Sequence, residues 1–149
     1  MILKTLLILA SAFAFYWQIR MKKIYPLVIT VGMIVGILMV LLPYGIIHPY
    51  GFYVYMGFVA LAFFYALIDI KVTIGAKMVI MLMAVSIFAY WLWVLNHWHG
   101  NEILAPIFTL LVVLVSVIGR VKLKNELGFI IILAVDAIAV ILEHWMKMT

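Results

Sequence analysis

Residues 127–146 read LGFIIILAVDAIAVILEHWM, an apolar run with a carboxylate, Asp136, at its centre and a second, Glu143, near its end. A helix needs about 20 apolar residues to cross the hydrocarbon core of a bilayer. The run also lacks the ten-residue alternation that is typical of membrane β-strands. The stretch therefore predicts a membrane-spanning helix that carries a buried acid.

The composition of the whole chain agrees with this prediction. Of its 149 residues, 70% are hydrophobic and 10% are charged, whereas a soluble domain has roughly 45–50% apolar and about 25% charged residues. So little polar surface excludes a soluble enzyme, a disordered chain and a free nucleic-acid binder. Because the chain has no cysteine, disulfides, thiolate catalysis and iron–sulfur ligation are excluded as well.

Five further runs have a similar length and apolar character, and the connections between them are short. We expect an all-α membrane protein in which residues 1–149 form a single polytopic transmembrane domain, a six-transmembrane-helix bundle. The Pro–Tyr–Gly units at 43–45 and 49–51 predict a tight turn between the second and third spans, because Pro and Gly both weaken a helix. The expected spans are Ile2–Ile19, Ile24–Ile47, Gly51–Ile68, Ile74–Leu95, Ile103–Gly119 and Leu127–Met146.

Basic residues predict the orientation of these spans. Eight of the ten lie in alternate connections, which places them on one side: Arg20, Lys22, Lys23, Lys71, Lys77, Arg120, Lys122 and Lys124. Loops rich in Lys and Arg face the cytoplasm. We therefore expect both termini outside, in a setting typical of a prokaryotic inner (plasma) membrane.

Aromatic residues gather toward the opposite ends of the spans and predict an outer interfacial belt. Its expected members are Tyr44, Tyr50, Tyr53, Tyr55, Tyr90, Trp91, Trp93, Trp98 and Trp145.

Asp136 is the first candidate for chemistry, because at roughly 1.5 Å per residue it falls near the bilayer midplane. A carboxylate there costs at least about 2.5–3.5 kcal/mol, so it must face the bundle interior and find a partner or stay protonated. Glu143, two turns further on, shares its face. One interpretation is a proton or cation step between the two acids. The other is a structural hydrogen bond to a partner subunit's helix or to a hydroxyl, such as that of Thr30, Ser86, Thr109 or Ser116.

Histidines form the second candidate site. All four fall on the expected outer side, near Glu102 and Glu143: His48, His97, His99 and His144. Imidazole and carboxylate groups bind Zn²⁺, Ni²⁺ or Cu²⁺, so one interpretation is an outward-facing transition-metal site. The other is that these side chains simply lie at a wet interface and that the protein has no cofactor.

Two pairs of small residues predict close helix packing. Gly32 and Gly36, and likewise Ala10 and Ala14, have the four-residue spacing that lets membrane helices approach each other. We expect them to pack within the bundle or against a partner.

Three functions remain open. The first expectation is a membrane-embedded subunit of a larger complex, because short-looped spans without a catalytic motif are typical of such subunits. The alternative is a small oligomeric proton- or cation-coupled transporter or channel that uses Asp136. The third is an outer-leaflet lipid or quinone enzyme, although an enzyme is less expected. The expected partners are membrane lipid and either other membrane subunits or further copies of the chain, and not nucleic acid.

Overall fold

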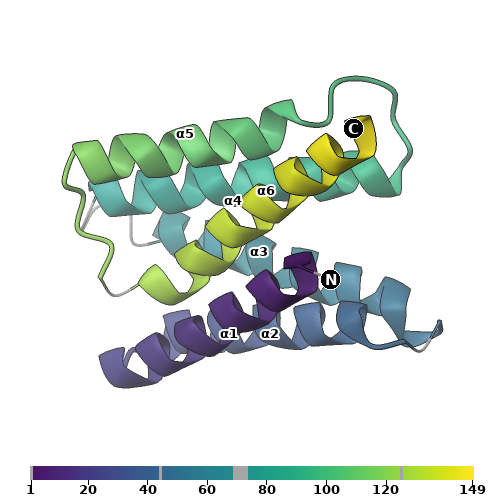
Figure 1. Ribbon diagram of the computed structural model, residues 1–149. Coiled ribbons are helices and arrows are strands. Elements are labelled where there is room, and N and C mark those ends of the chain that lie inside the picture. The colour runs from purple at the N-terminus through teal and green to yellow at the C-terminus, as the bar shows by residue number, and fades with distance from the viewer. Residues whose placement is uncertain (1, 44, 69–73, 125) are drawn as a thin grey trace.

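The computed structural model describes residues 2–43, 45–68, 74–124 and 126–149, and these residues form six helices and no strand (Figure 1). Tyr44 of the expected aromatic belt and Lys71 of the expected basic connections lie outside the described residues. The helices are α1 (Ile2–Met21), α2 (Ile24–Leu41), α3 (Ile47–Ile68), α4 (Ile74–Leu95), α5 (Leu104–Ile118) and α6 (Leu127–Met148).

The all-helical prediction is confirmed. Four of the described helices, α2, α3, α4 and α6, are each long and apolar enough to cross a membrane. The helix α5 is apolar as well, with 15 residues.

The largest difference from the expected spans lies between α2 and α3. The helix α2 ends at Leu41 rather than Ile47, and α3 begins at Ile47 rather than Gly51. The prediction that both Pro–Tyr–Gly units belong to the turn is therefore wrong for the second one. Pro49 is the third residue of α3, and the first turn of a helix tolerates proline because its N–H groups have no partner within the helix.

The helix α6 packs against four other helices. It crosses in front of α4 in Figure 1 and contacts α1, α2, α4 and α5. Accordingly, its residues from Gly128 to Val140 supply much of the core, including the fully buried Phe129, Ile132 and Leu133. An acid in the middle of α6 is thus surrounded by other helices rather than by lipid.

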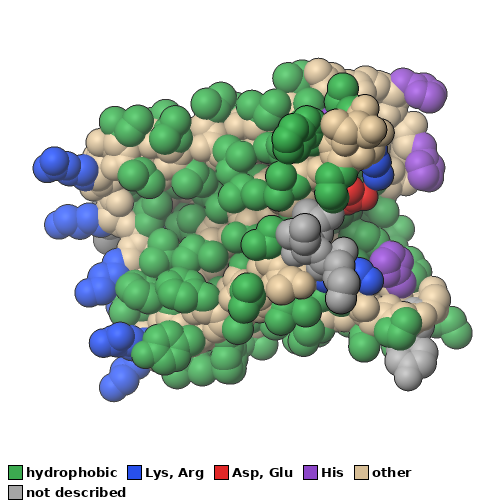
Figure 2. All heavy atoms as spheres, in the orientation of Figure 1, with side chains coloured by type: hydrophobic (Ala, Val, Ile, Leu, Met, Phe, Trp, Pro, Cys, Tyr) green, Lys and Arg blue, Asp and Glu red, His purple; other side chains and the backbone are tan. Residues whose placement is uncertain are grey.

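Charge separates along the length of the bundle. Figure 2 shows most of the visible Lys and Arg side chains at one end, and the His side chains together with some Lys or Arg at the other. The start of α1 and the end of α6 both lie at the His end (Figure 1). The exposed Lys and Arg side chains of the other end, here called the basic end, are Arg20, Lys22, Lys23, Arg120, Lys122 and Lys124.

Lys77 departs from the predicted arrangement. It lies in the first turn of α4 rather than in a loop, and only 3% of its surface is exposed. A cation that the sequence assigned to a wet connection is therefore inside the protein.

Three helices are followed by a residue in the left-handed conformation. Lys22 follows α1 with φ 54°, His97 follows α4 with φ 51°, and Arg120 follows α5 with φ 53°. After α4 and α5 the next N–H group bonds back into the last turn, from Trp98 to the Trp93 carbonyl at 3.2 Å and from Val121 to the Ser116 carbonyl at 3.0 Å. This is the Schellman arrangement, which supplies partners to carbonyls that the helix leaves unpaired.

The small residues that the sequence singled out lie at helix contacts. Gly32 and Gly36 are buried on α2 and face α3, where a Cβ on Gly36 would lie 2.7 Å from the backbone nitrogen of Tyr55. Ala10 and Ala14 are buried on α1, and a Cβ on Gly128 of α6 would lie 3.0 Å from the Ala14 carbonyl oxygen. Side chains larger than these would separate the helices.

Candidate functional site

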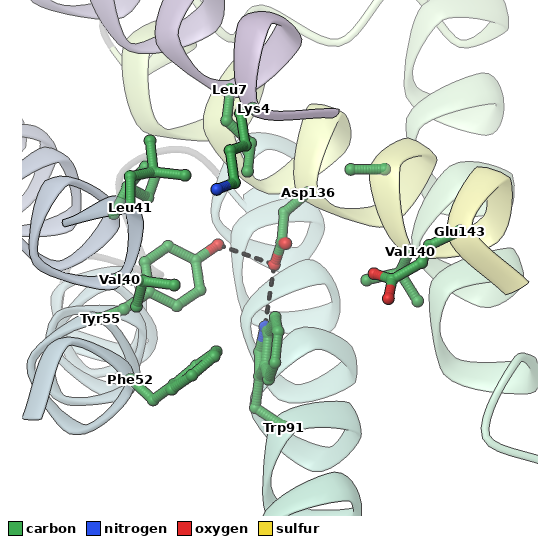
Figure 3. A pocket seen from close by; sticks show the side chains of 12 residues that line it. Lys4, Leu7, Val40, Leu41, Phe52, Tyr55, Trp91, Asp136, Val140 and Glu143 are labelled. Carbon is green, nitrogen blue, oxygen red and sulfur yellow. Dashed lines mark hydrogen bonds between the residues drawn. The ribbon is translucent and has the colours of Figure 1, made fainter. Parts of the chain in front are cut away.

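Asp136 lies inside the bundle with 5% of its surface exposed. Two side chains from other helices donate hydrogen bonds to its Oδ2 atom. The Tyr55 hydroxyl, on α3, is 3.0 Å away, and the Trp91 indole nitrogen, on α4, is also 3.0 Å away. The carboxyl group of α6 therefore joins three helices at a single oxygen atom (Figure 3).

These partners differ from the expected ones. Each of the proposed hydroxyls instead donates to a carbonyl of its own helix, as the 2.7 Å bond from Thr30 to Pro26 illustrates. The same holds for Ser86, Thr109 and Ser116. A hydroxyl bonded back to its own helix is not aimed at a neighbouring one, so the expectation of a Ser or Thr partner for Asp136 is corrected.

Tyr55 and Trp91 are residues that the sequence reasoning misplaced. Tyr55 was assigned to the outer aromatic belt, yet it is 4% exposed and packs in the core. By contrast, Tyr50, Tyr53, Trp98 and Trp145 are each more than half exposed. The position of Tyr55, more than two turns inside α3, is the signal that could have separated it from the belt.

A cavity of about 360 Å³ opens beside Asp136. Its walls are mainly apolar and aromatic, and Figure 3 shows Phe52, Tyr55 and Trp91 on one side of the carboxyl group. Lys4 and Glu143, which also line it, are exposed. The cavity, called here the Asp136 cavity, therefore runs from the His end of the bundle down to a buried carboxyl group.

Glu143 connects this cavity to two others at the same end. It also lines a cavity of about 250 Å³ with Glu102 and His144, and one of about 580 Å³ with His48. Its carboxylate is 2.9 Å from Lys147, in an exposed pair one turn apart. Asp136 and Glu143 thus share one cavity, with Asp136 at its buried part and Glu143 at its rim.

The expected histidine site is not assembled. Within the described part of the chain, no three His, Asp or Glu side chains lie close enough to hold a metal ion. His48 interacts instead with the Val40 carbonyl at 2.8 Å and packs its ring against Phe52. His97 occupies the helix-ending position described above, and neither it nor His99 lines the cavity that contains Glu102, Glu143 and His144.

A second buried polar cluster lies at the basic end. The Lys77 ammonium is 3.1 Å from Oε1 of Glu126, and the side chains of this ion pair are 4% and 8% exposed. The Tyr65 hydroxyl donates to the same oxygen at 3.1 Å, and the ammonium lies 3.8 Å from the centre of the Tyr65 ring. The cluster ties α3 and α4 to the residue that precedes α6.

Sequence reasoning gave no role to this cluster, because its members are far apart in the chain and each resembles an interfacial residue. The one available signal is the position of Lys77, three residues inside an apolar run.

Comparison with known proteins gives no assignment. No family model, no curated protein and no solved structure matches the chain. The function is therefore argued from the two buried clusters and the cavity.

Proposed function

We propose that the protein is a small membrane transporter in which Asp136 binds the transported or coupling cation. The observation that carries this proposal is a buried carboxyl group that lines a cavity together with Lys4 and Glu143, which are exposed at the His end. Ionisable residues within membrane-spanning segments are costly, and they commonly mark ion or substrate pathways. An acid that only forms hydrogen bonds between helices would not require a cavity beside it.

The proposal includes six spans with both termini outside. Six consecutive helices, with α1 beginning and α6 ending at the same end of the bundle, support an even number of crossings (Figure 1). The basic end would be cytoplasmic by the positive-inside rule, in a prokaryotic plasma membrane. The Asp136 cavity would then open to the outside.

The buried cluster at the basic end supports transport rather than simple binding. Within the described residues, Lys77, Glu126 and Tyr65 form a buried cluster at the basic end, whereas Lys4 and Glu143 line the Asp136 cavity at the His end. A carrier needs access from one side at a time. An ion pair that closes the inner end while the outer end is open fits one of the two required states. Since 149 residues enclose little space, we expect several copies to assemble.

The test is charge movement by the purified protein, reconstituted in liposomes on a solid-supported electrode. Rapid jumps in H⁺, Na⁺, K⁺ and a phenylalkylammonium salt are applied to the wild type and to Asp136→Asn. We expect at least one cation to give a current that the variant loses while it retains its helix content and native mass. Wild-type protein without a current for any of the four would overturn the proposal.

A second candidate function is a membrane-embedded subunit of a larger complex, and one observation favours it. An apolar groove of about 300 Å³ lies between α1 and α2, lined in part by Ser11, Ala12 and Ile34. At this groove the Ser11 hydroxyl oxygen is buried without a hydrogen-bond partner among the described residues, which is costly for the chain as it stands.

Gentle extraction of the untagged protein, followed by native mass spectrometry, separates the two functions. Stoichiometric foreign subunits would favour the complex, whereas a homo-oligomer would favour the transporter.

A further inference from the structure

The Asp136 carboxyl group lacks a charged partner in the described part of the chain. The two ion pairs found there join Lys77 to Glu126 and Lys147 to Glu143. Tyr55 and Trp91 are neutral donors, and both bonds end on Oδ2 (Figure 3). The Oδ1 atom therefore remains for a ligand, and a buried carboxylate is stabilised most by a cation that also donates a hydrogen bond.

The lining of the cavity does not suit a bare metal ion. Metal cations such as Ca²⁺ take six or more oxygen ligands. Around Asp136 the cavity wall is instead built from side chains such as Leu7, Ile37, Leu41 and Val140. No cluster of three metal-binding side chains occurs among the described residues. A ligand of this cavity should carry its own apolar surface.

Aromatic rings stand next to the carboxyl group. The ring centres of Phe52 and Trp91 are 4.9 Å apart, and both residues line the cavity with Tyr55. Aromatic faces attract organic cations, and burial strengthens this attraction. The cavity volume of about 360 Å³ is at the lower end of the range of about 300–1,000 Å³ for small-molecule pockets, which suits a single ring on a short chain.

Building on the proposed transport function, we propose that the Asp136 cavity binds a primary organic ammonium ion with a small apolar or aromatic body. The ammonium group donates a hydrogen bond to Oδ1 of Asp136. Its body lies against Phe52, Trp91 and the aliphatic wall, and it enters past Glu143 at the rim of the cavity.

The positive charge of Lys4 should weaken the binding of this ligand. Its side chain comes from the first turn of α1 and points into the same cavity (Figure 3), although no ion pair joins it to Asp136. A fixed positive charge on the wall repels a second cation. Removing it without changing the shape of the cavity should therefore strengthen ammonium binding.

The test uses three probes of nearly the same shape: 4-phenylbutylammonium, the neutral 4-phenylbutanol and the anionic 4-phenylbutanoate. Binding to the full-length detergent-solubilised protein is measured by titration calorimetry. We expect saturable binding of the ammonium probe alone. Asp136→Asn should weaken it on the order of 30-fold or more, because it removes one member of a buried charge pair. Asp136→Glu should retain part of the affinity.

Lys4→Gln should tighten ammonium binding several-fold, whereas Lys122→Gln, which removes the same charge at the basic end, should leave it unchanged. The inference is overturned if the alcohol or the carboxylate binds as well as the ammonium probe, if no probe binds, or if Asp136→Asn binds the ammonium probe with wild-type affinity.

The inference and the transport proposal fail separately. Currents on H⁺ or Na⁺ jumps that depend on Asp136, without ammonium binding, would overturn the inference and support transport. Ammonium binding that depends on Asp136, with no current for any cation, would support the inference and overturn the transport proposal.

Discussion

The hydroxyl of Tyr55 and the indole N–H of Trp91 meet at one oxygen of Asp136. Hydrogen bonds to charged groups contribute about 1.5–3 kcal/mol, more than the roughly 1 kcal/mol of bonds between neutral groups. Two donors on one oxygen also fix the carboxyl plane. The loss of unfolding free energy when one bond is removed therefore measures how much these bonds stabilise the position of the Asp136 side chain.

Tyr55→Phe removes one of these donors and keeps the ring. We expect the free energy of unfolding to fall by about 1.5–3 kcal/mol, measured by denaturant titration in mixed micelles. Tyr53→Phe is the matched control, because Tyr53 is 62% exposed on the same helix. Equal effects of the two substitutions would contradict the hydrogen bond from Tyr55.

Lys77 and Lys147 provide a comparison between two Lys–Glu pairs in one chain. The first pair is buried and the second is exposed. Removing one partner of a buried pair leaves an uncompensated charge and costs about 3–5 kcal/mol, whereas exposed pairs contribute up to about 1 kcal/mol.

Glu126→Gln should therefore destabilise the protein by several times as much as Glu143→Gln, as measured by thermal unfolding in detergent. Combining Glu126→Gln with Lys77→Met should recover part of the loss, since no buried charge remains. A double variant that is less stable than Glu126→Gln alone would argue against this explanation.

At the residue scale, sequence reasoning identified Asp136 but not its surroundings. A lone acid in an apolar run stands out because its burial is costly. Tyr55 and Trp91 do not stand out, since aromatic residues are common both in cores and at interfaces. Whether an aromatic residue lies in the core or at the interface depends on the rotation of its helix about its axis. That rotation is set by packing against other helices.

Between elements, the contact of α2 with α3 depends on glycine. Gly36 on α2 lies against the backbone of Tyr55, and Gly51 on α3 lies against that of Val40. A Cβ added to either glycine would lie 2.7 Å from the facing backbone nitrogen. Overpacking a tight contact usually costs about 1–3 kcal/mol. Because Tyr55 stands at this contact, the spacing of the two helices also positions the donor to Asp136.

Gly36→Ala should therefore lower stability by about 1–3 kcal/mol and weaken ligand binding in the Asp136 cavity. Gly57→Ala on α3 is the control, because a Cβ there meets nothing within 4 Å. Since Ala favours a helix by about 1 kcal/mol over Gly, this control should be neutral or slightly stabilising. Thermal unfolding and calorimetric titration test both effects.

The helices themselves were largely predictable, because long apolar runs leave few alternatives to a helix in a bilayer. The boundary at residues 42–50 was not. Pro49 suggests a break when taken alone, but the first turn of a helix accepts it. In the structure this segment is already helical from Ile47, and Gly51 packs against α2.

For the molecule as a whole, the separation of charges makes the orientation testable. The native chain has no cysteine, so single cysteines report their own side. Asn101→Cys, at the His end, should react with a membrane-impermeant maleimide in intact cells. Lys122→Cys, at the basic end, should react only after permeabilisation. The opposite pattern would reverse the proposed orientation and turn the cavity toward the cytoplasm.

The helix α5 has one further consequence. Its 15 residues span about 22 Å, whereas the hydrocarbon core is about 30 Å thick. Its outer face is lipid-like, with Leu111, Leu114 and Val115 each more than half exposed. Such a hydrophobic mismatch is relieved by local thinning of the bilayer. With α5 as one of the six proposed spans, the bilayer should thin beside this helix, and copies that bring their α5 helices together would share one thinned patch of membrane.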